Sequence, residues 1–319
     1  MQPDYDLIVH GICFADLIYG QVPHLPAPGE EVHCGAFGFS GGGAFITAVA
    51  AARLGLKVAI LSPFGQGPLE QVVKGLLESE GVDTQWAYQS PDPLPFVTVA
   101  INHGGDRGFL TYESSQHHAA FQAHCLRVVN KVSASWLHLG AHPHTLPLVE
   151  LALKKNIQVS MGTAWDPEWL QDPDLIHLIA CSHLFLANRQ EAEAITRTHS
   201  LRAAGQALEA LAPRFAITNA DQGGLYRELA SPPRPFASDP TPVVDSTGAG
   251  DNFTAGVLAG LINGATFRQA VDLGSYCGRQ SVRGFGGTST AARLADANHY
   301  LEPAGWALRP FTHRLHAID

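Results

Sequence analysis

Short apolar runs alternate with longer amphipathic segments along most of the chain. Runs rich in Val, Ile and Leu predict buried β-strands, which we place at residues 7–9, 58–61, 136–139, 157–160, 184–186 and 215–218. Segments between them have helical periodicity, and the helices predicted from it span residues 45–54, 69–77, 146–155 and 201–211. Strands that alternate with helices of this length predict βαβ units and a mainly parallel sheet covered by helices on both faces.

Two segments break this alternation. Residues 12–40 and about 88–112 are rich in Gly and Pro, and polar and apolar side chains alternate in the run Phe96–Ile101. A period of two is typical of strands with one buried face. We therefore predict a small β unit from these two segments; the alternative is a pair of long surface loops.

Composition indicates an ordinary globular protein. The 319 residues are 45% hydrophobic and 15% charged, which suits one large α/β domain or two small ones. The net charge of −9 without any basic run argues against a nucleic-acid partner. No apolar run reaches the ~18 residues of a membrane span, and the first residues lack a secretion signal. We expect a cytoplasmic protein that binds no membrane.

Cysteine and histidine give no metal site. The five cysteines are scattered and form no Cys-x-x-Cys pair, which argues against zinc and for a reducing compartment. The sixteen histidines include His117–His118 and His142–His144, but none has the spacing of a known metal motif. We interpret His117–His118 and His142–His144 as exposed polar loop residues; the alternative is that they bind a metal.

The most informative motif is Asp245–Asp251, with the sequence Asp-Ser-Thr-Gly-Ala-Gly-Asp, followed by an apolar stretch. A Gly-Ala-Gly turn that runs into a helix directs backbone N–H groups and the positive helix end at one point, which suits an anion such as a phosphoryl group. Asp251 would lie in the first helical turn, where its carboxylate can accept a proton from an attacking hydroxyl. The alternative is a glycine-rich loop whose Asp is favoured by the helix dipole alone.

This motif resembles the signature of the ribokinase-like (PfkB) carbohydrate kinases, with Ser246 in place of the usual Thr, and the similarity extends over roughly residues 5 to 290. The resemblance implies a three-layer α/β/α sandwich with a mainly parallel central sheet and a small β lid. It also implies that Asp251 is the catalytic base, and that Gly248, Ala249 and Gly250 form an anion hole for the transferred phosphoryl group.

The resemblance further implies an acceptor site. Asp16 matches the Asp that hydrogen-bonds acceptor hydroxyls, and Gly41 and Gly42 match the family's Gly-Gly motif before an Ala-rich helix. Ile46 occupies the position where the family normally has a substrate-contacting Asn, so we expect poor activity on ribose and fructose. Arg107 matches an Arg of the lid, which pairs with a lid carboxylate or reaches the substrate.

A nucleotide site is implied in the same way. Asn188 and Glu191 match the Asn-x-x-Glu motif, in which the Asn lies near the phosphates and the Glu holds Mg²⁺ through water. Thr218 and Gly223 match the ATP-binding turn, although Ala220 replaces a usual Gly. A monovalent cation such as K⁺, which family members often bind, would have two nearest ligands, Asp245 and Thr247.

The predicted organisation follows from these matches. An α/β core comprises residues 1–11, 41–87 and 113–319, and the lid comprises residues 12–40 and 88–112, through which two copies could pair as a homodimer. The tail from residue 294 has no counterpart in the resemblance.

We therefore predict an ATP- and Mg²⁺-dependent kinase that phosphorylates a hydroxymethyl group of a sugar or sugar-like acceptor. One alternative is a nucleoside kinase of the same fold, since Ile46 suits a less hydroxylated acceptor; another is a pseudokinase that only binds ligands. No P-loop motif or dinucleotide-binding glycine pattern is present. The pattern Gly38–Gly42 fits a hydrolase nucleophile elbow but lacks an oxyanion motif.

Overall fold

The computed structural model describes residues 3–103, 106–114 and 118–311, with the backbone alone for residues 106 and 107. Its main sheet has eight strands, in the order β14 (Arg234–Phe236), β13 (Gly224–Arg227), β12 (Phe215–Thr218), β11 (Leu184–Asn188), β10 (Gln158–Gly162), β9 (Ala134–Gly140), β1 (Tyr5–His10) and β4 (Val58–Leu61). The strands from β4 to β12 are parallel, and β13 and β14 are antiparallel. Every residue of β1 and β4 is buried, which explains the uninterrupted apolar runs Leu7–Val9 and Val58–Leu61.

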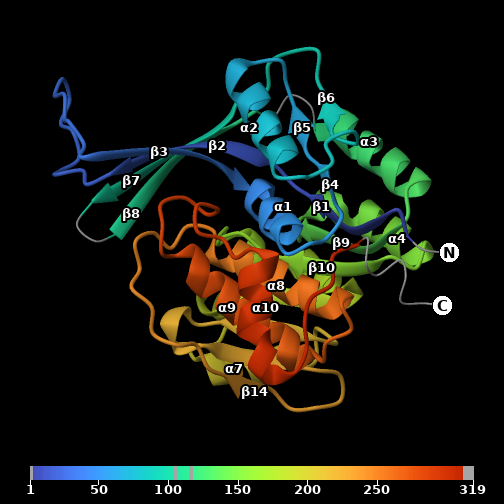
Figure 1. Cartoon of the computed structure of the whole chain (residues 1–319). Coiled ribbons are helices and arrows are strands. Elements are labelled where there is room, and N and C mark those ends of the chain that lie inside the picture. The colour runs from blue at the N-terminus through green and yellow to red at the C-terminus, as the bar shows by residue number, and fades with distance from the viewer. Residues whose placement is uncertain (1–2, 104–105, 115–117, 312–319) are drawn as a thin grey trace.

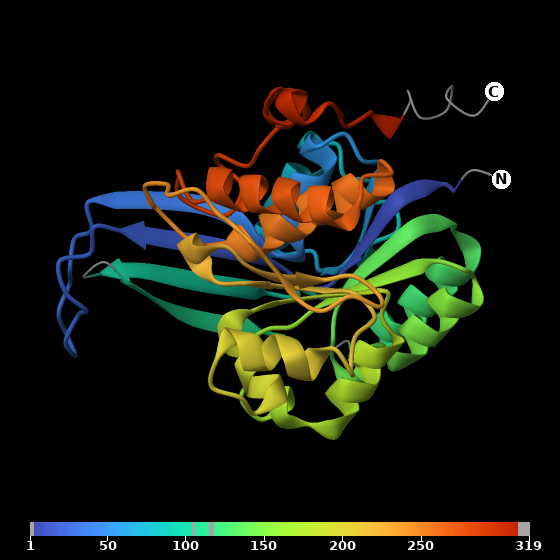
Figure 2. The same cartoon turned by 90° about the horizontal axis from the view of Figure 1, so that it is seen from below.

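Helices cover both faces of this sheet (Figure 2). One face packs against α1 (Ala44–Arg53), α2 (Pro68–Ser79), α8 (Ala249–Ile262), α9 (Phe267–Ser281) and α10 (Leu294–Leu301). The opposite face packs against α3 (His118–Lys131), α4 (Leu146–Lys154), α5 (Pro173–Cys181), α6 (Arg189–Thr196) and α7 (Leu201–Leu208). Short 3₁₀ turns occur at Pro143–Thr145, Trp169–Gln171, Ala220–Gln222 and Glu302–Ala304, and β5 (Pro63–Phe64) pairs with β6 (Tyr88–Gln89).

A second, four-stranded sheet projects from this body (Figure 1). This projecting sheet has the order β3 (Ala36–Gly43), β2 (Cys13–Gly20), β7 (Phe96–His103) and β8 (Asp106–Glu113). Its strands come mainly from the two predicted segments, residues 12–40 and about 88–112, although β3 continues to Gly43 and β8 to Glu113.

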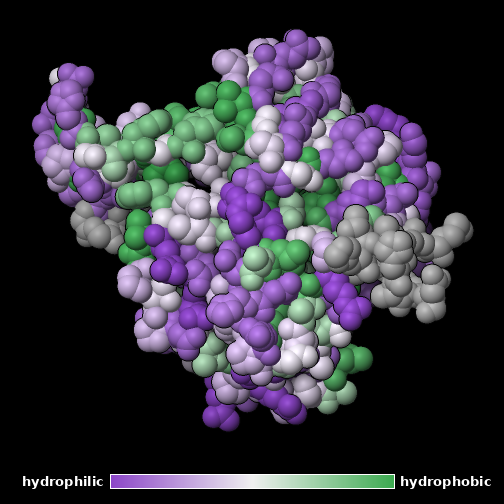
Figure 3. Space-filling model, viewed as in Figure 1, coloured by the Kyte–Doolittle hydropathy of each residue, from purple (hydrophilic) through white to green (hydrophobic). Residues whose placement is uncertain are grey.

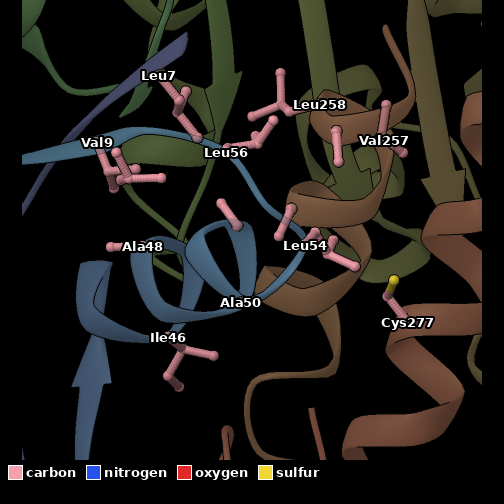
Figure 4. Close-up of a cluster of buried hydrophobic side chains, with 14 of the residues drawn as sticks. Leu7, Val9, Ile46, Ala48, Ala50, Leu54, Leu56, Val257, Leu258 and Cys277 are labelled. Atoms are coloured by element: carbon pink, nitrogen blue, oxygen red, sulfur yellow. The ribbon is translucent and has the colours of Figure 1, made fainter. Parts of the chain in front are cut away.

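Small residues bring α8 close to its neighbours. Gly256 and Gly260 lie against α9, where a Cβ atom at either position would come within 2.8 Å of the backbone of Gly274 or Ala270. On its other side α8 meets the Ala-rich helix α1, and their side chains share one core cluster with β1 (Figure 4). This packing holds the first turn of α8 at the carboxyl edge of the parallel strands.

The mainly parallel sheet with helices on both faces agrees with the sequence prediction. The observed helices α1, α2, α4 and α7 lie within a few residues of the predicted ones. Among the described residues, no helix is both long and apolar enough to cross a membrane.

Candidate active site

Two adjoining hollows lie at the carboxyl edge of the parallel strands. The first, which we call the central cavity, has a volume of about 540 Å³ and is lined by the ends of β1, β9, β10, β11 and β12 and by the first turns of α1 and α8. The second, the side pocket, measures about 170 Å³ and lies among the turn after β12 and helices α8 and α9. Gly250 lines both hollows. A ligand that spans them would therefore pass over the first turn of α8.

The first turn of α8 has the geometry of an anion site. Gly248 is the N-cap residue with φ of 71°, a left-handed conformation that favours glycine. A Cβ atom at Gly248 would lie 2.8 Å from the Cα of Gly287, whereas one at Gly250 would meet nothing within 4 Å. The backbone at Gly250 is thus open to the two hollows, at the end of the helix where N–H groups lack helical partners.

Asp251 lies in this turn with its carboxylate at the central cavity. Its Oδ1 accepts a hydrogen bond of 2.7 Å from the Oγ1 of Thr47 on α1. Although Asp251 stays partly accessible to the cavity, desolvation raises its pKa to about 6, while the bond from Thr47 opposes that rise. A carboxylate with a pKa just below neutral pH is ionised at pH 7 and can take up a proton during a reaction.

Asp16 faces the same region from the projecting sheet. Its carboxylate lies against Gly42 of the neighbouring strand β3, where any Cβ atom would overlap it. A Cβ atom at Gly41 would likewise overlap the ring of Phe45. Burial raises the pKa of Asp16 to about 7, and the negative charge of Asp251 adds to this shift. The glycines are therefore needed for the close approach between β3, Asp16 and α1.

Asn188 and Glu191 lie together at the start of α6. The side chain of Asn188 accepts a hydrogen bond of 2.9 Å from the N–H of Glu191, and Glu191 Oε2 accepts one of 2.9 Å from the N–H of Asn188. They form a reciprocal capping box, and both also line the central cavity. Burial raises the pKa of Glu191. Helix capping and ligand binding are thus compatible at these two residues.

Asp245 organises the loop before α8. Its Oδ1 accepts hydrogen bonds from the N–H and the Oγ1 of Thr247, at 2.9 and 2.7 Å, and its Oδ2 accepts one of 2.9 Å from the N–H of Gly286. The loop is thereby tied to the segment after α9. No group of three or more His, Cys, Asp or Glu side chains in the described part of the chain has the geometry of a metal site.

The side pocket includes the predicted ATP-binding turn. Thr218 and Gly223 line it, together with Ala220 at a φ of 49°. A left-handed φ is the conformation that glycine adopts most easily, so the Ala at this position is strained. Arg279 of α9 lies on the opposite wall and is paired with Asp239 at 2.7 Å.

The predicted acceptor residues Asp16, Gly41, Gly42 and Ile46 lie near the central cavity but are not among the residues that line it. Ile46 is only 2% exposed, does not line the central cavity, and packs against Gly248 and Gly287. The next residue, Thr47, lines the cavity in its place. Arg107 lies in β8, but its side chain is outside the described residues.

Sequence reasoning missed two histidines of the central cavity. His10 ends β1, and His138 lies near the end of β9. A polar residue at the carboxyl end of an otherwise buried parallel strand is a signal of such a site, because ligands bind at that edge in open α/β sheets.

Comparison with known proteins identifies the family. Residues 5–293 match the sequence pattern of the pfkB family carbohydrate kinase. The chain belongs to this family. Among its pfkB relatives, the ribokinase of Haemophilus influenzae is 26% identical over 322 residues, covering 93% of this chain and 99% of the relative. An uncharacterized sugar kinase of Escherichia coli K12, YegV, is 28% identical over 262 residues, covering 79% and 81% of the two chains.

The solved structures agree on the fold. The ribokinase of Arabidopsis thaliana complexed with ribose and ATP superimposes with a TM-score of 0.79, at 17% identity, over 95% of this chain and 99% of that one. The predicted pfkB resemblance and three-layer fold are thus confirmed, and the chain is a carbohydrate kinase of this family.

Proposed function

We propose that this carbohydrate kinase transfers the γ-phosphoryl group of ATP to a hydroxymethyl group of a sugar or sugar-like acceptor, with Asp251 as general base. The observation that carries the proposal is the position of Asp251, which lies at the central cavity within the same helical turn as Gly250. The acceptor occupies the central cavity and the nucleotide occupies the side pocket. The Arabidopsis ribokinase that this chain resembles in fold is complexed with ribose and ATP.

The chain's own groups supply the steps around the transfer. Asp16 accepts hydrogen bonds from acceptor hydroxyls, beside the close-packed Gly41 and Gly42. Asp251 takes the proton of the attacking hydroxyl, and the hydrogen bond from Thr47 holds its carboxylate in place. Backbone N–H groups of Gly248, Ala249 and Gly250 stabilise negative charge on the transferred group.

The described residues fit Mg²⁺ held chiefly by phosphates and water. The ion usually keeps several waters and takes one or two carboxylates, and Glu191 offers one carboxylate at the central cavity beside Asn188. When bound, Mg²⁺ neutralises charge on the phosphates. The monovalent cation expected at Asp245 and Thr247 stays a prediction, as does the contact of Arg107 with the acceptor.

Two classes of acceptor, sugars and nucleosides, are compatible with this function. A nucleoside kinase is favoured by one observation, the apolar Ile46 that replaces a polar family residue. An acceptor screen over pentoses, hexoses, sugar acids and nucleosides, with ADP release as the readout, decides between them.

The role of Asp251 is tested by Asp251→Asn. We expect turnover to fall by at least ~10²-fold, because loss of a general base typically costs about 10²–10⁴-fold, while ATP binding measured by calorimetry stays within a factor of a few. The matched control is Asp296→Asn, which changes a first-turn Asp of α10 remote from both hollows. A variant with near-native kcat would remove Asp251 from the mechanism.

A thermal melt shows that lost activity is not lost folding. The pKa of Asp251 is raised in the folded state, so this carboxyl stabilises the fold when protonated, and that contribution is lost as the pH rises through about 6. At pH 7 the ionised carboxylate of Asp251 therefore lowers the free energy of unfolding. We expect Asp251→Asn to melt at the native temperature or a few degrees higher.

Pairing of two copies through the outer face of the projecting sheet also belongs to this proposal. That face carries large apolar side chains exposed to solvent, including Phe37, Leu110 and Tyr112.

A further inference from the structure

His10 is a buried histidine without a hydrogen-bonding partner in the part of the chain that the structure describes. It ends the wholly buried strand β1 and is 5% exposed. Its ring stacks on Phe121 of α3, with centroids 5.3 Å apart and an interplanar angle of 7°. Neither Nδ1 nor Nε2 meets a partner among the described residues. Buried polar atoms are rarely left unpaired, and such an exception calls for an explanation such as a ligand.

His10 lines the central cavity together with a second histidine. His138 enters from β9, next to β1, with its Nδ1 2.9 Å from the Oγ of Ser160. Burial lowers the pKa of His10 to about 3 and that of His138 to about 4, so both imidazoles are neutral at pH 7. A neutral imidazole offers one N–H donor and one nitrogen acceptor.

The charges around the cavity select among ligands. Its lining includes the carboxylates of Glu113, Glu191 and Asp251, and no Lys or Arg occurs among the described residues that line it. An anionic group placed beside the two neutral histidines would meet these carboxylates with no Lys or Arg of the described lining to balance its charge. A hydroxyl group, which both donates and accepts, matches a neutral imidazole without this repulsion.

We propose that His10 and His138 form a hydroxyl-binding subsite of the central cavity, which directs the kinase to uncharged acceptors rather than to sugar acids or sugar phosphates. The proposal rests on the proposed function and adds two residues that determine specificity. His10 makes the main contact, because neither of its ring nitrogens has a partner among the described residues, whereas one nitrogen of His138 is already bonded to Ser160.

The first experiment replaces His10 with Phe, which keeps a ring for stacking on Phe121 and removes both nitrogens. We expect kcat/KM for the best neutral acceptor to fall about 10- to 100-fold, with the KM for ATP unchanged. The matched control is His124→Phe on α3, since His124 is hydrogen-bonded to the carbonyl of Trp86 and does not line the cavity. An equal loss in the control, or an unchanged kcat/KM in His10→Phe, would overturn the proposal.

Two further readouts separate binding from a structural role. Because His10 lacks partners, His10→Phe should melt no lower than the native protein without acceptor, yet lose most of the stabilisation that acceptor adds. In a series of acceptors that each lack one hydroxyl, the acceptor that lacks the hydroxyl bound by His10 should react equally well with the native enzyme and with His10→Phe. If His10→Phe fails to fold, the histidine is structural and the proposal is wrong.

The acceptor screen tests the predicted preference for uncharged acceptors directly. A native enzyme that prefers neutral acceptors by at least ~10-fold over the matching acids and phosphates supports the subsite, and a preference for an anionic acceptor overturns it. If the native enzyme phosphorylates nothing in the screen, the proposed function fails as well. If it phosphorylates neutral acceptors and His10→Phe does so equally, only the subsite fails.

Discussion

Thr47 and Asp251 show how a short contact sets the chemistry of one residue. The hydrogen bond between them stabilises the carboxylate form of Asp251 and so opposes the rise of its pKa. Since the base works only when ionised, kcat/KM should rise with pH through the pKa of Asp251, which is about 6, and through that of Asp16 at the acceptor site, which is about 7. Thr47→Val removes this hydrogen bond, so it should raise the pKa of Asp251 and shift the acidic limb of the pH–rate profile to higher pH.

The measurement is a pH–rate profile between about pH 5 and 9 at low acceptor concentration. Thr47→Ser is the control, because it keeps the hydroxyl and should keep the native limb. An unshifted limb in Thr47→Val would show that the contact does not tune the base.

Ile46 leads to a second prediction at the residue scale. An Asn offers a donor and an acceptor to a sugar hydroxyl, whereas Ile offers neither, and an unpaired hydroxyl costs about 1–3 kcal/mol. The structure adds that Ile46 packs beside Gly248 and Gly287 and does not line the central cavity, so no polar atom reaches the acceptor from this position. We expect kcat/KM for ribose and fructose below ~10⁴ M⁻¹s⁻¹, the lower end of ordinary enzymes.

Steady-state kinetics with both sugars, on the native protein and on Ile46→Asn, checks this expectation. Ile46→Val controls for the change in packing, because it removes one methyl group and adds no polar atom. A native enzyme that already exceeds ~10⁴ M⁻¹s⁻¹ with either sugar would refute the argument.

The residues that sequence analysis identified lie in contiguous motifs. Asp245–Asp251 and Asn188–Glu191 each fold within one loop and one helical turn, so a local pattern is enough to identify them. His10 was missed, because its surroundings depend on the fold: its ring packs against Phe121 of α3, which is more than a hundred residues away in sequence. Likewise, no local pattern reports that Thr47 faces Asp251.

At the scale of elements, the first turn of α8 depends on two glycines for different reasons. Gly248 has a left-handed φ and no room for a side chain, so Gly248→Ala should lower the free energy of unfolding by about 1–3 kcal/mol. Gly250 is helical and faces open space, so Gly250→Ala should leave stability unchanged or slightly higher. Its methyl group would nevertheless enter the passage between the two hollows, and kcat should fall ~10-fold or more.

Urea unfolding and steady-state kinetics on both variants make the comparison. Gly264→Ala, after α8, is a further control, because it shares a positive φ but lies away from both hollows. A Gly250→Ala enzyme with native kcat would contradict an anion hole at this turn.

Elements were predicted best where burial is complete. The central strands are buried on both faces and appear as uninterrupted apolar runs, as in β4. Helix α3 was harder to predict, because its buried positions are interrupted by polar residues and it begins in a histidine-rich stretch. The alternation in the two irregular segments predicted strands but not their partners. β2 pairs in parallel with β7, some eighty residues later, which depends on the whole fold.

At the scale of the whole molecule, the projecting sheet has two different faces. Its register places Asp16 and Thr98 on one face, and Leu17, Tyr19, Val97, Val99, Leu110 and Tyr112 on the other. Tyr19, Leu110 and Tyr112 on that outer face are 37%, 68% and 59% exposed. Hydrophobic residues accordingly gather on the surface of this sheet in Figure 3. An exposed apolar patch of this kind marks an interaction site more often than a free surface.

We expect a second copy of the chain to cover this outer face. The same face on two copies can pair around a two-fold axis, which buries both apolar surfaces and leaves Asp16 directed at the acceptor. Leu110→Glu would place two charges in such an interface and should convert a dimer into a monomer in sedimentation velocity at micromolar concentration. Leu229→Glu is the matched control, since Leu229 is 69% exposed but lies on the turn after β13, away from the projecting sheet.

Because β2 carries Asp16 on its other face, loss of the dimer should loosen the acceptor site and raise the acceptor KM more than the KM for ATP. A native protein that sediments as a single chain at every concentration would refute the proposed pairing of two copies through the outer face.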